Sequence, residues 1–383
     1  MLLLAASLLV PQNLPDAQPL PAATEAAVRE VRGADRNAWF DAKQAEAAER
    51  AAARGLAWLA AHQTEAGAWT GLVGHKQNHD YVAMPNGLPV RAQASTGHGH
   101  VGVAAFAVLA FLAGGHLPDR GEYGKVVRAG HDYLVAHCQE NGMLADSGTR
   151  MYSHAFATLC LAEAYGMAQT ANAKSVLERA VNLIVDSQNA YGGWRYNAFD
   201  REIDLSVTVC QVQALRAARN IGIRVPLDTI DRAMAYVLKS RVPAGRNQGL
   251  FYYKIHGRGA FEKSGDFAIN AAALTALSSA GIHDENLTEP VLRFLLDDYP
   301  ALADWGLDHY FFWYGNYYAA QAFYQAGGAP CRQYFAALLR DLLRWQQADG
   351  SWANRVGPGD EWSTAIACIL LQMPKQYLPI FQR

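Results

Sequence analysis

The chain alternates between stretches that are apolar on one side and stretches that are apolar almost throughout. Segments 45–62, 175–187 and 228–238 have the spacing of amphipathic helices that bury one face. The runs between them have almost no polar face, which predicts helices enclosed by other helices. These enclosed helices are expected at 101–113, 152–166, 205–219, 267–280, 317–326 and 364–373. The pattern therefore predicts an outer and an inner layer of helices.

A short turn recurs ahead of the enclosed helices. Its clearest copies are Gln63–Trp69, Gln188–Trp194 and Gln346–Trp352, each with a glycine two positions before the tryptophan. Weaker copies surround Gly142, Gly249 and Gly306. Glycine ends a helix readily because it accepts a left-handed backbone. We expect the glutamine to hydrogen-bond to the next hairpin and the indole to stack on it. Six copies predict an all-α fold, an (α/α)6 toroid of six helical hairpins.

Length and composition fit one large toroid. A chain of 383 residues would suggest two domains, but stacked repeats extend a single core. We therefore assign 26–383 to one domain, and 1–25 to a signal peptide or a disordered tail. Charged residues make up 18% and the net charge is −2, which excludes an extended nucleic-acid surface. The five cysteines are scattered, unlike a disulfide framework or a structural zinc site.

The turns resemble the QW repeats of squalene-hopene cyclases and of their relatives in the prenyltransferase group. The chain is more similar still to a large group of uncharacterised bacterial squalene-cyclase-like proteins. That resemblance rests on segments 151–167, 192–199, 204–219, 310–323 and 377–381. It implies a toroid with a central cavity, and it indicates fold and family more strongly than reaction.

All inner helices should begin at one end of the ring, which predicts a ligand site there. In cyclases of this fold an Asp-x-Asp-Asp motif at an inner-helix start supplies the initiating proton. Here Glu202 and Asp204 match its first and third positions, but Leu205 occupies the last. Asp204 is thus a candidate catalytic acid with Glu202 beside it. Alternatively, it is the N-cap that commonly precedes an apolar helix.

Aromatic side chains form a second candidate group. Cyclase cavities are lined by aromatic faces because their π electrons stabilise carbocations. The same lining would also bind a lipid, a sugar ring or a peptide, and aromatic residues at helical spacing are often plain core. The candidate ligand-binding residues are Tyr310, Trp313, Tyr314, Tyr317 and Trp362.

Polar side chains in the adjacent loops form a third group. Arg195 and Tyr196, together with Tyr152 and His154, could bind an acidic or sugar-like ligand. Polysaccharide lyases on related toroids use Tyr, His and Arg to abstract a proton beside a carboxylate. Tyr152 and His154 are therefore further catalytic candidates, and an ordinary solvated loop surface is the alternative.

Histidines are enriched in the first long loop, at His75, His79, His98 and His100, beside Asp80. Their spacing can chelate a metal, but no helix is predicted to hold it. We expect no metal and assign His98 and His100 to ligand binding. The sequence has no Gly-rich phosphate loop and no nucleophile elbow, so we expect no cofactor.

Three functions remain open from the sequence. The first is a cyclase-like or prenyltransferase-like protein that binds an apolar isoprenoid-type molecule, with or without transforming it. The others are a non-catalytic toroid that binds a ligand or peptide, and a lyase-like carbohydrate enzyme. We expect a hydrophobic small-molecule partner, no nucleic acid and no membrane span. We expect the protein to be exported if segment 1–10 is a signal peptide, and to be cytoplasmic otherwise. The sequence leaves the oligomeric state open.

Overall fold

The computed structural model describes residues 39–71, 76–77, 80–81, 99–145, 150–170, 172–309, 311–354 and 358–382. The chain divides into two units, Met1–Ala38 and Trp39–Arg383, and every described residue belongs to the second. Segment 1–25 lies outside the described residues. Among the helices that are described, none is long and apolar enough to cross a membrane.

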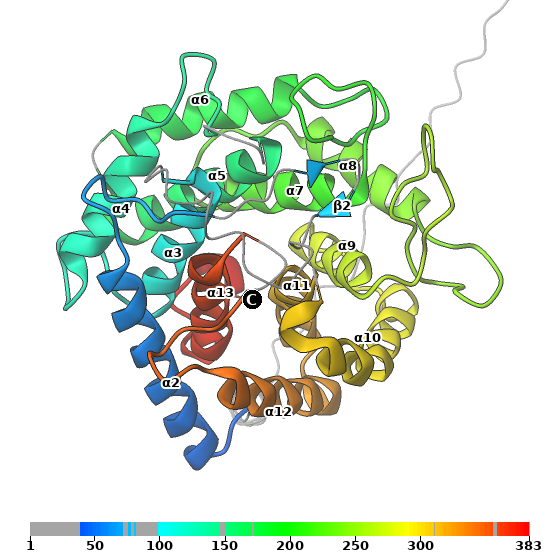
Figure 1. Cartoon of the computed structure of the whole chain (residues 1–383). Helices are drawn as coiled ribbons and strands as arrows, with labels where there is room; N and C mark the ends of the chain where they lie inside the picture. Colours follow the sequence, from blue (N-terminus) through cyan, green and yellow to red (C-terminus); the bar gives the residue numbers. More distant parts are fainter. Residues whose placement is uncertain are drawn as a thin grey trace, which may run out of the picture. The chain divides into compact units, whose positions relative to one another are not determined.

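The second unit contains two concentric layers of helices (Figure 1). The outer helices are α2 (Ala42–Ala61), α4 (Gly124–Ala136), α6 (Ala173–Asp186), α8 (Leu227–Lys239), α10 (Glu285–Trp305) and α12 (Gly328–Trp345). The inner helices are α3 (Val101–Ala113), α5 (Arg150–Ala168), α7 (Leu205–Asn220), α9 (Phe267–Ser279), α11 (Phe312–Ala326) and α13 (Asp360–Gln372). Short elements complete the described part: β1 (Lys76–Gln77) paired with β2 (Asp80–Tyr81), η2 (Gly306–Asp308), η3 (Met373–Lys375) and η4 (Pro379–Phe381).

The inner helices form a closed ring. Each one packs against the next along the chain, and α13 packs back against α3. In the outer layer the first helix, α2, contacts the last, α12, so the first and last hairpins meet there as well. The (α/α)6 toroid predicted from the repeat is therefore confirmed.

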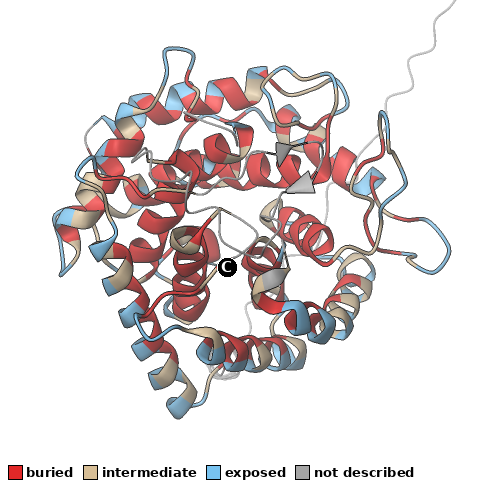
Figure 2. Cartoon of the chain, in the orientation of Figure 1, coloured by how far each residue is buried: buried red, intermediate tan, exposed pale blue. Residues whose placement is uncertain are grey.

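Burial follows the two layers (Figure 2). Every residue of α3 is buried, as is every residue of α9 except the last. Outer helices such as α8 bury only the face that meets the inner ring. The enclosed and the amphipathic runs of the sequence thus occupy the predicted layers, because only a helix surrounded by other helices can bury all its faces.

The glutamine of the repeated turn ties one hairpin to the next. Gln63 Nε2 donates to the carbonyl of Gly67 at 3.0 Å, within its own turn, and to Val126 in α4 at 2.9 Å. The two other clear copies make the same pair of bonds: Gln188 to Gly192 and Thr229 in α8, and Gln346 to Gly350 and Ala51 in α2. The last of these joins the two ends of the ring, as predicted for the glutamine.

The tryptophan of the turn has two contacts, of which the sequence predicted one. Trp352 packs on α2, the next outer helix around the ring, where a Cβ added to Gly55 would lie 2.9 Å from the indole. Its Nε1 donates to Leu342 of its own outer helix at 2.8 Å. Trp69 and Trp194 donate in the same way. The indole therefore does more than stack on the neighbour, because its buried N–H needs an acceptor.

Candidate functional site

A cavity of about 440 Å³ lies where the inner helices begin. The first turns of all six inner helices, or the loops before them, contribute to its wall. The lining residues are His100, Gly102, Val103, Phe106, Tyr152, Ser153, Phe156, Arg195, Tyr196, Ser206, Tyr253, Lys263, Asp266, Ala268, Ile269, Phe311, Tyr314, Pro358 and Trp362. A pocket of this size suits a small molecule.

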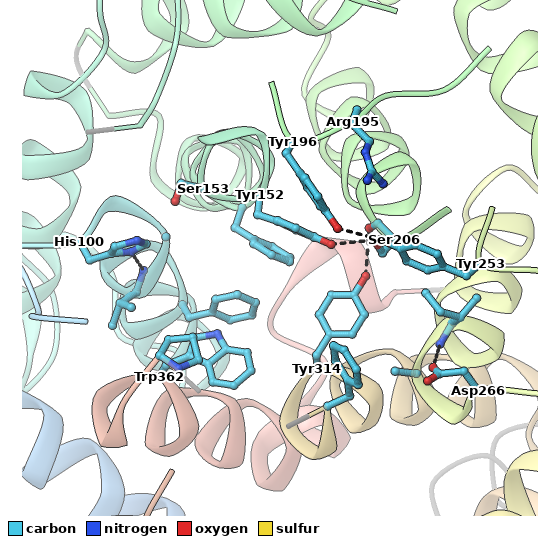
Figure 3. A pocket seen from close by; sticks show the side chains of 18 of the residues that line it. His100, Tyr152, Ser153, Arg195, Tyr196, Ser206, Tyr253, Asp266, Tyr314 and Trp362 are labelled. Carbon is cyan, nitrogen blue, oxygen red and sulfur yellow. Dashed lines mark hydrogen bonds between the residues drawn. The ribbon is translucent and has the colours of Figure 1, made fainter. Parts of the chain in front are cut away.

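One side of the cavity is aromatic. The ring centroids of Phe106 and Phe156 lie 4.5 Å apart, and those of Phe106 and Trp362 lie 6.3 Å apart with the rings perpendicular. Figure 3 shows Trp362 on the cavity wall together with Tyr152 and Tyr314. These rings belong to α3, α5 and α13, which are neighbours in the ring. The result is a continuous apolar wall.

Asp204 lies behind the opposite, polar side. Its backbone N–H donates to the carbonyl of Trp194 at 3.0 Å, so the repeated turn fixes its position. One carboxylate oxygen accepts the backbone N–H of Val207 at 2.9 Å, which caps α7. The residue is completely buried. The N-cap interpretation of Asp204 is thus correct, but it is not the whole role of this side chain.

Three side chains also donate to the Asp204 carboxylate. Ser206 Oγ donates to Oδ1 at 2.7 Å, Tyr253 Oη donates to Oδ2 at 3.1 Å, and Arg195 forms an ion pair with Oδ2. Burial alone would lower the pKa of Arg195, but the neighbouring carboxylate raises it overall. Every partner gives a hydrogen to Asp204, which is the environment of an ion-paired carboxylate and not of a proton donor.

The tyrosines around Asp204 are linked in two short chains. Tyr152 Oη lies 2.6 Å from Ser206 Oγ, and Tyr196 Oη lies 2.8 Å from Tyr253 Oη. Tyr314 Oη donates to the backbone carbonyl of Ser206 at 3.0 Å (Figure 3). Burial, and then the charge of Asp204, raises the pKa of Tyr152 and Tyr253 far above the usual range. These phenols are therefore neutral hydrogen-bonding groups and poor bases.

Glu202 does not share the site of Asp204. Its carboxylate bonds Lys254 Nζ at 2.7 Å and lies 3.8 Å from Arg195 Nε. The hydrogen bond from Lys254 lowers the pKa of Glu202. The nearest cation of Glu202 is thus Lys254, whereas that of Asp204 is Arg195, which lies between the two carboxylates. Glu202 is the more exposed of the two carboxylates.

Several predicted site residues lie away from the cavity. His154 is fully buried between backbone groups, since Nδ1 accepts the N–H of Leu144 at 3.1 Å and Nε2 bonds the carbonyl of Ala180 at 3.2 Å. Trp313 is buried against Phe312. The structure places both in the packing between helices and so does not bring them to the site.

The remaining predicted residues lie behind the cavity wall, in it, or outside the described residues. Tyr317 packs behind the aromatic wall, 5.2 Å from the ring of Phe106. His100 lines the cavity and also caps α3, because its Nδ1 accepts the N–H of Val103 at 3.2 Å. Two further ligand candidates, Tyr310 and His98, lie outside the described residues, as do His75 and His79.

Sequence reasoning missed several lining residues, among them the two aromatic residues Phe106 and Phe156 and the two hydroxyl-bearing residues Ser206 and Tyr253. The repeat held a signal for Tyr253. It stands four positions after Gly249, as Tyr196 stands four after Gly192. Aligning the turns position by position would therefore have placed the two tyrosines together. Among the described residues, no group of three His, Cys, Asp or Glu side chains could hold a metal ion.

Comparison with known proteins supports the fold. No protein-family model matches the sequence, and no curated protein matches it. One similar solved structure is the type II terpene cyclase MstE from Scytonema in complex with geranylgeranyl dihydroxybenzoate, with a TM-score of 0.53 and 13% identity over 88% of this chain and 100% of that chain. Another is an inactive variant of an α-1,6-mannanase of Salegentibacter in complex with α-1,6-mannotriose, with a TM-score of 0.58 and 9% identity over 87% and 99%.

A glycosidase variant is also similar, with a TM-score of 0.55 and 13% identity over 89% of this chain and all of that chain. These proteins share the α/α toroid but differ in chemistry. Because one fold hosts unrelated reactions, the likeness establishes the architecture of this chain and not its activity.

Proposed function

We propose that this chain binds an apolar, isoprenoid-type small molecule in the cavity at the start of the inner helices. The aromatic wall of Phe106, Phe156 and Trp362 is the observation that supports this proposal. Aromatic faces bury large apolar area and attract positive charge, which suits an unsaturated hydrocarbon chain. The likeness to a terpene cyclase fold is consistent with this class of ligand.

Acid-initiated cyclisation is not part of the proposal. A carboxyl group that starts such a reaction must carry a proton and direct it at the ligand. Asp204 instead accepts hydrogen bonds from Arg195, Tyr253, Ser206 and the backbone of Val207. Each of these bonds would have to rearrange before Asp204 could donate. Binding therefore agrees with the geometry better than cyclisation by this residue.

The carbohydrate alternatives have weaker support. Hydrolysis of a glycoside generally uses two carboxyl groups that flank the bond. Asp266 is the one acidic residue among the described residues of the cavity wall, and its side chain caps α9 through the N–H of Ile269 at 2.9 Å. A lyase would use a tyrosine as the base, but burial raises the pKa of Tyr152, Tyr253 and Tyr314.

Calorimetric titration with geranylgeraniol tests the proposal, with Trp362→Ala as the informative variant. Loss of this large aromatic face should weaken binding about tenfold or more, the equivalent of roughly 1.5 kcal/mol of buried apolar surface. Trp305→Ala is the matched control, because Trp305 is exposed on α10 and lies outside the cavity wall. The proposal fails if the wild-type protein shows no saturable binding, or if Trp362→Ala binds as tightly as wild type.

A further inference from the structure

The hydrogen bonds around Asp204 have a fixed direction. As the partner of Arg195 in an ion pair, Asp204 is a carboxylate and can only accept. Ser206 therefore points its hydroxyl hydrogen at Oδ1, and Tyr253 points its hydrogen at Oδ2. A hydroxyl group has one hydrogen, so neither residue has another to donate.

The fixed hydrogens of Ser206 and Tyr253 also determine the direction of the hydrogen bonds made by the tyrosines of the cavity wall. The 2.6 Å contact between Tyr152 and Ser206 needs one hydrogen, and Ser206 has used its own, so Tyr152 is the donor. By the same reasoning Tyr196 donates to Tyr253. Tyr314 donates to the carbonyl of Ser206. In Figure 3 the hydroxyl groups of Tyr152, Tyr196 and Tyr314 all point toward the Ser206 side of the cavity.

Tyr152 therefore meets a ligand as a hydrogen-bond acceptor. Its hydrogen is held by Ser206, while its oxygen has further lone pairs beside the cavity. A ligand hydroxyl can donate to that oxygen. A carboxylate or phosphate has no hydrogen to give, and its negative charge would face an oxygen lone pair. Arg195 offers little compensation, because its charge is paired with Asp204 and its guanidinium stacks on the ring of Tyr196 at 4.3 Å. Lys263, the other cation of the described cavity wall, is exposed, so solvent screens its charge.

We propose that the cavity selects a ligand with a hydroxyl group on its apolar body, and that Ser206 sets this preference by holding Tyr152 as an acceptor. The inference rests on the proposed function and adds the polar group of the ligand to it. Ser206 acts as a positioning residue: its effect on the ligand runs through the orientation of the Tyr152 hydroxyl.

The experiment compares three ligands that differ only in the head: geranylgeraniol, geranylgeranic acid and the hydrocarbon of the same chain. In wild type the alcohol should bind about three- to tenfold more tightly than the acid or the hydrocarbon, the range of one neutral hydrogen bond. Tyr152→Phe should reduce this preference to about twofold or less while hydrocarbon binding remains, because only the hydroxyl oxygen is lost.

Ser206→Ala tests whether Ser206 sets the ligand preference by orienting the Tyr152 hydroxyl group. Without Ser206 Oγ, the Tyr152 hydrogen is released and can be donated to the ligand, so the alcohol-to-acid affinity ratio should fall at least threefold. Ser363→Ala is the control, because Ser363 is a buried serine of α13 that bonds the carbonyl of Trp352 at 2.6 Å and not Asp204. It should leave the ratio as in wild type.

The outcomes distinguish the two proposals. If none of the three ligands binds to wild type, the proposed function is wrong and the inference falls with it. If all three bind with equal affinity, ligand binding stands and the preference for a hydroxyl group is wrong. If the alcohol is preferred but folded Ser206→Ala keeps the wild-type ratio, the role of Ser206 is wrong. Should Ser206→Ala fail to fold, an undiminished preference in Tyr152→Phe overturns the inference.

Discussion

Replacing Glu163 with glutamine should remove a pH-dependent loss of stability from this protein. Glu163 lies in the inner helix α5 and is 2% exposed. Its carboxyl accepts the backbone N–H of Ile380 at 2.9 Å, so it holds η4, the segment near the end of the chain, against the ring. Burial raises the pKa of Glu163 from 4.5 to about 8, although the Ile380 bond and the charge of Arg216 oppose the shift.

The direction of the effect follows from proton binding. Between pH 4.5 and about 8 the folded protein keeps the Glu163 proton and the unfolded chain releases it. The contribution of Glu163 to the free energy of unfolding is therefore fully present below pH 4.5 and is lost as the pH rises to about 8. The free energy of unfolding falls by roughly 1.4 kcal/mol for each pH unit, so the loss over the whole interval is roughly 4 to 5 kcal/mol.

His154 works in the opposite direction and sets the useful pH range. Burial lowers the pKa of His154 to about 4, so stability from that group is complete above pH 6.5 and is lost as the pH falls toward 4. Above pH 6.5 its contribution is constant. Between pH 6.5 and 8 the loss from Glu163 should be roughly 2 kcal/mol.

Urea unfolding from pH 6.5 to 9 measures the effect as the difference between wild type and Glu163→Gln. Glutamine keeps an oxygen that accepts the Ile380 N–H but cannot ionise. The variant should thus gain roughly 2 kcal/mol relative to wild type across this range. Glu178→Gln, at an exposed position of α6, tests whether loss of any negative charge has the same effect. Parallel stability curves for wild type and Glu163→Gln would refute the reasoning.

Two substitutions test how the ring closes and how Asp204 is used. Gly350→Ala should cost about 2 to 4 kcal/mol of unfolding free energy, because φ is +100° there and the new Cβ would lie 2.7 Å from the Arg54 carbonyl of α2. Gly222→Ala, at φ +84° with open space around it, should cost only the backbone strain of about 1 to 2 kcal/mol; equal losses in urea unfolding would contradict the ring-closure argument. Asp204→Asn keeps a good N-cap but removes the close ion pair of Arg195 and leaves it only the more distant Glu202 at 3.8 Å, so a loss of roughly 2 to 3 kcal/mol of unfolding free energy is expected. No measurable loss would mean that Asp204 is a cap and little else.

The sequence predicted the ring because its closing contacts repeat in the chain. Each clear turn carries glutamine, glycine and tryptophan at the same spacing, and the three residues make the same contacts in all three copies. The site was harder to predict, because the spacing of residues along a helix had to be used to find which side chains face the cavity. Tyr152 and Phe156 are four residues apart and share the cavity face of α5, whereas His154 is two residues from Tyr152 and points to the opposite side.

The direction of the hydroxyl hydrogens could not be predicted from sequence at all. It depends on a chain of contacts from Arg195 through Asp204 and Ser206 to Tyr152, which come from two helices and a loop. The sequence placed Asp204 before an apolar helix and left its roles as acid and as cap open. The structure shows the cap, and the ion pair with Arg195 makes Asp204 an acceptor toward its neighbours, while its role as an acid stays a prediction.

The repeated turn also explains where the group of polar side chains around Asp204 comes from. In the third turn the two positions that follow the turn aromatic are Arg195 and Tyr196, and both line the cavity. In the fourth turn the second of these positions is Tyr253, which completes the group around Asp204. In the first turn the same positions are Thr70 and Gly71, which bring no phenol or cation. Because glutamine, glycine and tryptophan close the ring, the two positions after them are free to set the chemistry of the cavity without altering the toroid.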